Sequence, residues 1–158
     1  MRHKNLVLLI LLLAVGLTGC GGAPKVDWEL AITGAVSTPL TLGYDDLAGM
    51  EFVDLNDILM EKSLGEDVVT SWSGVPLETI LSQAGAGDYV SITALAADGY
   101  AIEISRDETQ SAIVALKSHG EWIVDVPEEE GKGPMRLVCP ETPANRWVFQ
   151  LQEIQVNE

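Results

Sequence analysis

The sequence predicts a β-rich α+β domain with two or three short helices. Short segments of alternating or apolar residues recur between residues 28 and 156. The pair Asp98-Gly99 separates two of these segments, and an Asp-Gly pair in such a place is a strong signal for a β-hairpin. Only one segment, 74–84, combines helical apolar spacing with clear start and stop signals. Strands therefore dominate the predicted fold.

The first half of the domain is predicted to combine short strands with a short helix. Strands are expected at 28–36 and 40–42, and residues 44–47 carry the acidic first turn of a short helix. After Val53 the pattern becomes mixed, and no defined element is assigned to residues 54–70.

The clearest helix follows this undefined stretch. It is expected to begin at Gly74-Val75-Pro76, with the proline in its first turn, and Ile80 and Leu81 continue its apolar face. Gly85 is expected to end it, because glycine readily adopts the left-handed conformation that terminates helices.

The second half is predicted to consist of strands joined by tight turns. Asp98-Gly99 and His119-Gly120 are expected to form two hairpin turns. An acidic loop is expected at 127–133. The strands are expected at 89–95, 100–104, 112–116, 121–124, 135–139 and, as one long final strand, 147–156.

The N-terminus resembles the signal peptide of a bacterial lipoprotein. Basic residues Arg2 and Lys4 precede an apolar run at 6–13, and small residues at 14–19 lead to Cys20. The alternative is a transmembrane anchor, but the apolar run is shorter than the roughly 20 residues that a spanning helix needs. We therefore expect cleavage before Cys20 and lipid attachment to its sulfur.

These signals divide the chain into three parts. Residues 1–19 are the expected signal peptide, 20–27 the lipidated cysteine and a flexible tether, and 28–158 the folded domain. The mature protein is expected to be extracytoplasmic and anchored to a bacterial membrane, because several acyl chains give stable anchoring where one gives only marginal binding.

The charge balance excludes one class of partner. The chain has 9 Lys and Arg against 24 Asp and Glu, a net charge of −15, and removal of residues 1–19 would make it −17. Such a surface repels phosphate backbones, so no nucleic-acid partner is expected. It also has no basic patch to attract anionic lipid beyond the acyl anchor.

Few residues offer site chemistry. His119 is expected to be a turn residue, and Cys139 a buried structural thiol at the end of an apolar strand. One histidine and one thiol in the mature chain cannot form a histidine-rich or Cys-x-x-Cys zinc site, so no metal ligand is assigned. The 24 acidic residues leave open the alternative that a pair of carboxylates acts in acid-base catalysis, but they offer too many pairs to choose among, and no catalytic residue is assigned.

An ordered set of motifs resembles the molybdopterin-binding domain of the sulfite oxidase family. The set covers most of the expected mature chain and consists of Trp72-Ser73-Gly74-Val75-Pro76-Leu77, Asp98-Gly99-Tyr100, Gly133-Pro134-Met135-Arg136-Leu137-Val138-Cys139-Pro140 and Arg146-Trp147-Val148. The resemblance implies the sulfite-oxidase fold. In typical members it also implies a molybdenum held by a dithiolene pterin and by one protein cysteine.

The chain departs from that family pattern at two places. The family's ligating cysteine lies upstream of the tryptophan-glycine-valine-proline segment, and residues 54–71 contain no cysteine. Near the C-terminus the family often presents an arginine and, three residues later, a lysine that could meet the cofactor phosphate. Here Arg146 is present, but the second position is Phe149.

Two functions follow from the resemblance and its departures. The favoured one is a membrane-tethered, non-redox member that binds a small molecule or a protein partner and holds no cofactor. The alternative is a molybdopterin-dependent oxidoreductase or a subunit of one, and a structural envelope role also stays open. Trp72, Arg136 and Arg146 are the candidate cofactor-binding residues. The four tryptophans are expected mainly to pack the core and its rim, with lining of a cleft as the alternative.

Overall fold

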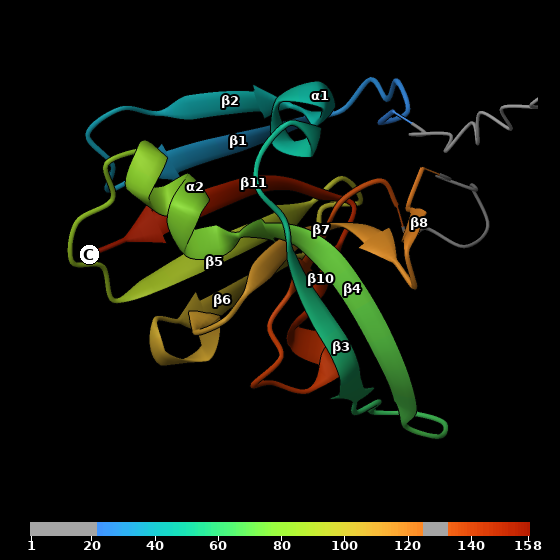
Figure 1. The fold of residues 1–158 in the computed structure, drawn as a ribbon. Coiled ribbons are helices and arrows are strands. Elements are labelled where there is room, and N and C mark those ends of the chain that lie inside the picture. Colours follow the sequence, from blue (N-terminus) through green and yellow to red (C-terminus); the bar gives the residue numbers. More distant parts are fainter. Residues whose placement is uncertain (1–21, 125–132) are drawn as a thin grey trace, which may run out of the picture.

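The computed structural model describes residues 22–124 and 133–158, which form two β-sheets with short helices at their edges (Figure 1). The expected signal peptide, Cys20 and nearly all of the acidic loop at 127–133 lie outside the described residues. The prediction of a β-rich α+β fold with few short helices is confirmed.

The first sheet has five strands in the order β2-β1-β11-β5-β6. β1 pairs with β11 in parallel, and every other neighbouring pair is antiparallel. The parallel pair places the first strand of the domain beside its last strand. The bounds are Glu29–Gly34 (β1), Leu40–Gly43 (β2), Ser91–Ala96 (β5), Ala101–Ser105 (β6) and Leu151–Asn157 (β11).

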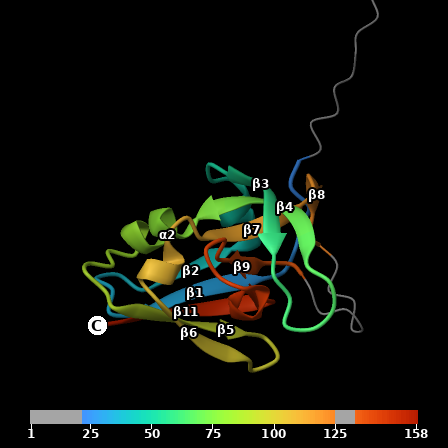
Figure 2. The ribbon, with the colours of Figure 1, turned by 90° about the horizontal axis from the view of Figure 1, so that it is seen from below.

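The second sheet has the order β10-β9-β7-β4-β3, with β8 paired to β7, and is antiparallel throughout. β3 and β4 form a long hairpin that projects from the body of the molecule (Figures 1 and 2). The bounds are Val53–Met60 (β3), Val68–Pro76 (β4), Ile113–Ser118 (β7), Glu121–Trp122 (β8), Arg136–Val138 (β9) and Val148–Phe149 (β10).

One buried apolar cluster takes side chains from both sheets. Leu30 and Ile32 alternate with more exposed residues along β1, as expected for a strand with one face in the core. Strand β9 is buried at every position and lies between β7 and β10 in the second sheet. Each fully buried aliphatic side chain contributes roughly 1.5–3 kcal/mol, so this cluster is the main source of stability.

Two α-helices and two short 3₁₀ helices connect the strands. Their bounds are Tyr44–Ala48 (α1), Leu77–Gln83 (α2), Asp107–Thr109 (η1) and Ala144–Arg146 (η2). The acidic first turn of α1 stabilises its start, since the Gly43 N–H donates a 2.8 Å hydrogen bond to the Asp46 carboxylate. The described part of the chain contains no helix with the length and hydropathy needed to span a bilayer.

The predicted start of α2 at Gly74-Val75-Pro76 was wrong, because these residues belong to a strand. Gly74 and Val75 do not begin the helix, because they extend β4 and pair with Ala115 and Val114 of β7. Pro76 is the last strand residue, and α2 starts at Leu77. The predicted end is confirmed, since Gly85 follows the helix with a φ of 70°.

Residues 54–70, to which the sequence assigned no element, contain most of β3 and the start of β4. The strand pairing is irregular between Leu55 and Ile58, where Asp57 has a φ of 53°. A bulge shifts the following side chains to the other face of the sheet, so the period-two pattern is lost. Exposed apolar residues such as Leu59 and Val69 blur the pattern further.

The predicted final strand at 147–156 is two strands in different sheets. β10 belongs to the second sheet and β11 to the first, and Gln150 joins them with a φ of 47°. Both segments have buried apolar residues, so their sequence alone reads as one continuous strand. The two predicted hairpin turns are confirmed, with Gly99 at a φ of 87° and Gly120 at 82°.

Candidate functional site

A cavity of about 500 Å³ lies between the end of the β3–β4 hairpin and the C-terminal segment. Its size falls within the range of roughly 300–1,000 Å³ that is typical of small-molecule sites. The hairpin end is fixed to η2, because the Ala144 N–H donates a 2.9 Å hydrogen bond to the Glu61 carbonyl. Its wall includes Met60, Lys62, Trp72, Arg136, Asn145 and Phe149.

Arg136 is the central polar residue of this wall. It lies on the fully buried strand β9, is 3% exposed, and faces Phe149 because the two residues are cross-strand partners in β9 and β10. Its guanidinium carbon is 3.4 Å from the centroid of the Phe149 ring and 4.7 Å from that of Trp72. Cation–π contacts of this kind stabilise a desolvated cation by about 2 kcal/mol.

The guanidinium of Arg136 has no carboxylate partner among the described residues. Its Nε–H is buried without an acceptor, and a terminal nitrogen lies 4.0 Å from the sulfur of Met60. Burial lowers the pKa of Arg136 to about 9, which still leaves the guanidinium charged at neutral pH. The site therefore holds a buried positive charge that the described side chains do not neutralise.

Trp72, which lines the same cavity, also carries a donor without a partner among the described residues. Its indole packs edge-to-face against Trp147 with centroids 6.2 Å apart, and its Nε1–H is buried without an acceptor. The neighbouring Trp147 differs, because its Nε1–H donates to the Cys139 carbonyl at 2.8 Å. Buried polar groups are normally hydrogen-bonded, so the Arg136 Nε–H and the Trp72 Nε1–H, both on residues that line one cavity, call for an explanation.

Arg146 does not line this cavity. It lies on η2, forms an ion pair with Glu108, and donates a 2.9 Å hydrogen bond to the Glu103 carbonyl. Partial burial acts to raise the pKa of the Glu108 carboxyl, but the hydrogen bonds from Ser105 and the ion pair with Arg146 together outweigh it and hold that pKa below its usual value. Of the three candidate binding residues, the fold thus brings Trp72 and Arg136 together and holds Arg146 elsewhere. A cofactor contact for any of them stays a prediction.

Cys139 is a free, fully buried thiol, as the sequence predicted. Burial is the largest cause that raises the pKa of its thiol, to about 12, so it is protonated at neutral pH. It does not line the cavity. His119 is also a turn residue as predicted, with a φ of 50° and its Nε2 within 3.2 Å of the Thr70 hydroxyl.

These positions test whether the cavity fits a molybdenum centre. Within residues 22–124 and 133–158 no group of three or more His, Cys, Asp or Glu side chains could hold a metal ion. The cavity wall formed by these residues contains no thiol. The residues present therefore do not fit a molybdenum that takes one ligand from a protein cysteine.

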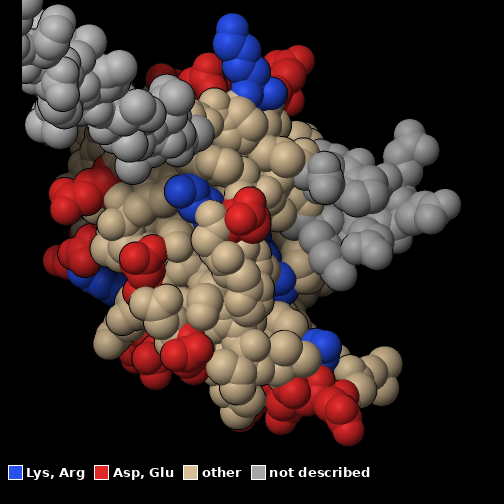
Figure 3. Space-filling model, turned by 45° about the vertical axis from the view of Figure 1, so that its right-hand side comes forward, with Lys and Arg blue, Asp and Glu red and all other residues tan. Residues whose placement is uncertain are grey.

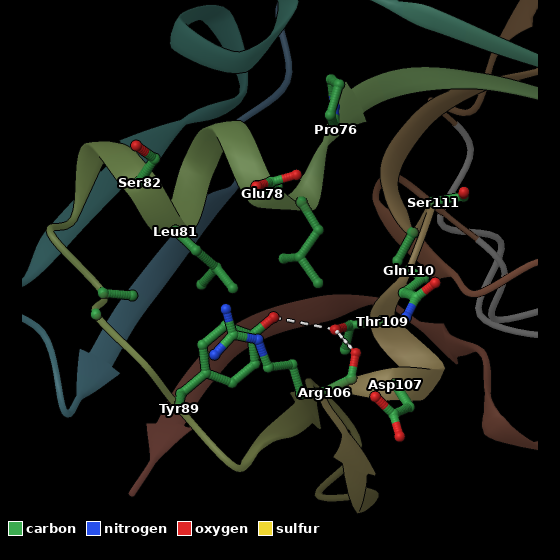
Figure 4. A pocket seen from close by; sticks show the side chains of 14 residues that line it. Pro76, Glu78, Leu81, Ser82, Tyr89, Arg106, Asp107, Thr109, Gln110 and Ser111 are labelled. Carbon is green, nitrogen blue, oxygen red and sulfur yellow. Dashed lines mark hydrogen bonds between the residues drawn. The ribbon is translucent and has the colours of Figure 1, made fainter.

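A second cavity of about 400 Å³ lies beside α2 (Figure 4). There the Tyr89 and Thr109 hydroxyls are 3.0 Å apart, and the Thr109 hydroxyl donates to the Arg106 carbonyl at 2.7 Å. The Arg106 guanidinium lies over the Tyr89 ring and also pairs with Asp88 at 3.0 Å. Because these groups already have partners, this cavity is the weaker candidate for a binding site.

A model of the family described as oxidoreductase molybdopterin binding domain matches residues 20–158. The chain belongs to this family. Its fold is similar to a solved structure of the sulfane dehydrogenase SoxCD from Paracoccus pantotrophus, with a TM-score of 0.73 and 20% sequence identity. That match covers 87% of this chain but only 40% of the SoxCD chain. No curated protein sequence matches the chain.

Membership of the family confirms the resemblance that the ordered motifs indicated. The sequence also selected two residues of the cavity, Trp72 and Arg136. It missed Met60 and Lys62, because no element was predicted at the end of the β3–β4 hairpin. In the sequence, Phe149 stands out only as a replacement for the family's lysine, and nothing in its neighbouring residues indicates that its ring covers Arg136.

Proposed function

We propose that this member of the molybdopterin-binding domain family is a lipid-anchored, extracytoplasmic binding protein without redox activity. Its ligand is a small molecule that occupies the cavity beside Arg136. The observation that carries this proposal is the buried guanidinium of Arg136, which has no carboxylate partner among the described residues, at a cavity of about 500 Å³. A binding site needs such an unused recognition group, whereas a purely structural domain would leave its cost uncompensated.

The absence of a suitable thiolate supports a role without molybdenum. Residues 54–71 contain no cysteine, and the buried Cys139 is protonated and lies away from the described cavity wall. Phe149 replaces a cation that the family often presents to the cofactor phosphate. Without that cation, a doubly charged phosphate has less to bind it in a chain of net charge −15.

The membrane anchor rests on the N-terminal sequence. A basic start, an apolar run of limited length and small residues before Cys20 are the features of a lipoprotein signal. An anchored domain with a small-molecule cavity is suited to capturing a ligand outside the cytoplasm.

The test is metal and pterin analysis of protein produced in a host that makes molybdopterin. We expect no stoichiometric molybdenum or pterin, and no turnover of sulfite or of a sulfoxide. A matched family member with the upstream cysteine, purified from the same host, serves as the control for cofactor loading. Near-equimolar molybdenum and pterin in this protein would overturn the proposal.

The second candidate function is a molybdopterin-dependent oxidoreductase or a subunit of one, which the family membership favours. If the purified protein contains the cofactor and Arg146 contacts its phosphate, Arg146→Ala should lower the amount of cofactor that the protein retains. An unchanged cofactor content in Arg146→Ala would then assign that arginine to its ion pair with Glu108 alone.

A further inference from the structure

The Arg136 site can be described by the kind of ligand that would complete it. Taking a cation out of water costs several kcal/mol unless it gains a partner. Arg136 is 3% exposed, its Nε–H has no acceptor, and no described carboxylate pairs with it. The aromatic contacts offset part of this cost, but they leave the Nε–H without an acceptor, and one terminal nitrogen has only the weak 4.0 Å contact with the Met60 sulfur. A ligand that supplies acceptors to these donors would recover the remainder.

The geometry of the guanidinium limits how such a ligand approaches. Its N–H groups point outward in the plane of the group, and Phe149 stacks on one face with the guanidinium carbon 3.4 Å from the ring centroid. An acceptor must therefore meet the edge and not the face. A carboxylate is the group whose two oxygens match two parallel N–H donors.

The cavity is larger than this interaction requires. An inorganic oxoanion would fill only a small part of about 500 Å³. Met60, Trp72 and Phe149 provide an apolar wall next to the guanidinium. The ligand is thus expected to carry an apolar body that replaces water against these side chains.

The charge distribution favours a ligand with a single negative charge. Arg136 is the buried cation of the described wall, and Lys62 is exposed to solvent at its rim. The chain has a net charge of −15, and several groups of acidic side chains lie on the face shown in Figure 3, with fewer basic side chains among them. One buried cation neutralises one negative charge, and the surrounding field repels any further charge.

We infer that the cavity binds a small organic monocarboxylate with an apolar body, whose carboxylate meets the edge of Arg136. This inference rests on the proposed small-molecule function and adds the class of ligand. Trp72 contributes its ring to the apolar wall against which the body of the ligand packs.

Calorimetric titration of the full mature protein, kept in detergent, tests the inference with phenylacetate and its neutral isostere phenylacetamide. We expect phenylacetate to bind at least about tenfold more tightly than the amide, a difference of about 1.4 kcal/mol. Sulfate is the third probe, and it is expected to bind more weakly than phenylacetate because it lacks the apolar body. Fluorescence of the tryptophans, one of which lines the cavity, provides an independent signal.

Arg136→Met should abolish the preference for the carboxylate while the protein stays folded, because an apolar side chain in place of an unpaired buried charge is often neutral or stabilising. Arg106→Met at the second cavity is the matched control and should retain the preference. If Arg136→Met does not fold, the comparison of phenylacetate with phenylacetamide in the wild-type protein still tests the inference.

Three outcomes would overturn the inference: equal binding of phenylacetate and phenylacetamide, carboxylate binding that persists in Arg136→Met, or no binding of phenylacetate. Equal binding of acid and amide would leave the proposed small-molecule function intact, whereas a molybdenum-loaded protein would remove that function whatever the titrations show. The two failures are therefore distinguishable.

Discussion

The ring of Phe149 covers the guanidinium of Arg136, with the guanidinium carbon 3.4 Å from the ring centroid. Phe149 occupies the position at which the resemblance to the sulfite oxidase family leads one to expect a lysine. The residue that replaces the expected lysine therefore provides the aromatic ring that packs on the buried Arg136. The two residues are direct partners across β9 and β10, so a change at one acts at once on the other.

Restoring a cation at this position should destabilise the protein. Phe149→Lys removes the aromatic contact and places a second positive charge beside a guanidinium that has no described carboxylate partner. We expect Phe149→Lys to cost about 3–4 kcal/mol in urea denaturation, against about 2 kcal/mol for the neutral control Phe149→Leu, which loses the aromatic contact but adds no charge. Equal stability of the two variants would show that the charge of Arg136 is neutralised by a group outside the described residues.

Gly74 is a position at which a methyl group should be poorly tolerated. A Cβ there would lie 2.1 Å from the Val114 carbonyl oxygen and 2.6 Å from the Ala115 Cα, both on the paired strand β7. Backbone atoms cannot move aside cheaply, so Gly74→Ala should cost at least about 3 kcal/mol or prevent folding. Gly87→Ala is the control, because a Cβ there meets nothing within 4 Å. The measurement is urea denaturation of both variants.

The buried thiol of Cys139 should make stability depend on alkaline pH. Its pKa rises from 9.0 in the unfolded chain to about 12 in the fold. Its stabilising contribution is therefore complete below pH 9 and is lost as the pH rises toward 12, by up to about 1.4 kcal/mol per pH unit. Cys139→Ala should lack this component when denaturation is followed at pH 8, 9 and 10.

The comparison of wild type with Cys139→Ala isolates the thiol from other alkaline titrations. Burial also raises the pKa of Tyr44 to about 12 and lowers that of Arg136 to about 9, and both groups are present in both proteins. The difference between the two stability curves should therefore change steadily above pH 9. Parallel curves between pH 8 and pH 10 would contradict a buried, protonated thiol.

Lipid attachment is predicted at Cys20. Cells that express the wild-type chain and are fed labelled fatty acid should give a labelled, membrane-bound protein of mature size. Cys20→Ala should give an unlabelled precursor, because the acceptor sulfur is gone. Cys139→Ala is the control and should be labelled like the wild type. Equal labelling of wild type and Cys20→Ala would disprove the lipoprotein assignment.

The sequence by itself determined the features that depend on a few adjacent residues. Asp98-Gly99 and His119-Gly120 formed the expected hairpin turns, and Gly85 ended the expected helix, because each conformation requires a positive φ that these residues adopt at low cost. The order of short motifs likewise indicated the family. Burial of Cys139 followed from its apolar neighbours alone.

Only the tertiary structure decided which distant residues meet. Gln150 turns the chain from one sheet into the other, and strand register then places Phe149 against Arg136. Arg146, only three residues before Phe149, is instead held by Glu108. Apolar patterning states which residues are buried, but pairing between strands far apart in the chain is set by the packing of the whole fold. The charge of Arg136, which no described carboxylate pairs, lies at the cavity as a consequence of that packing.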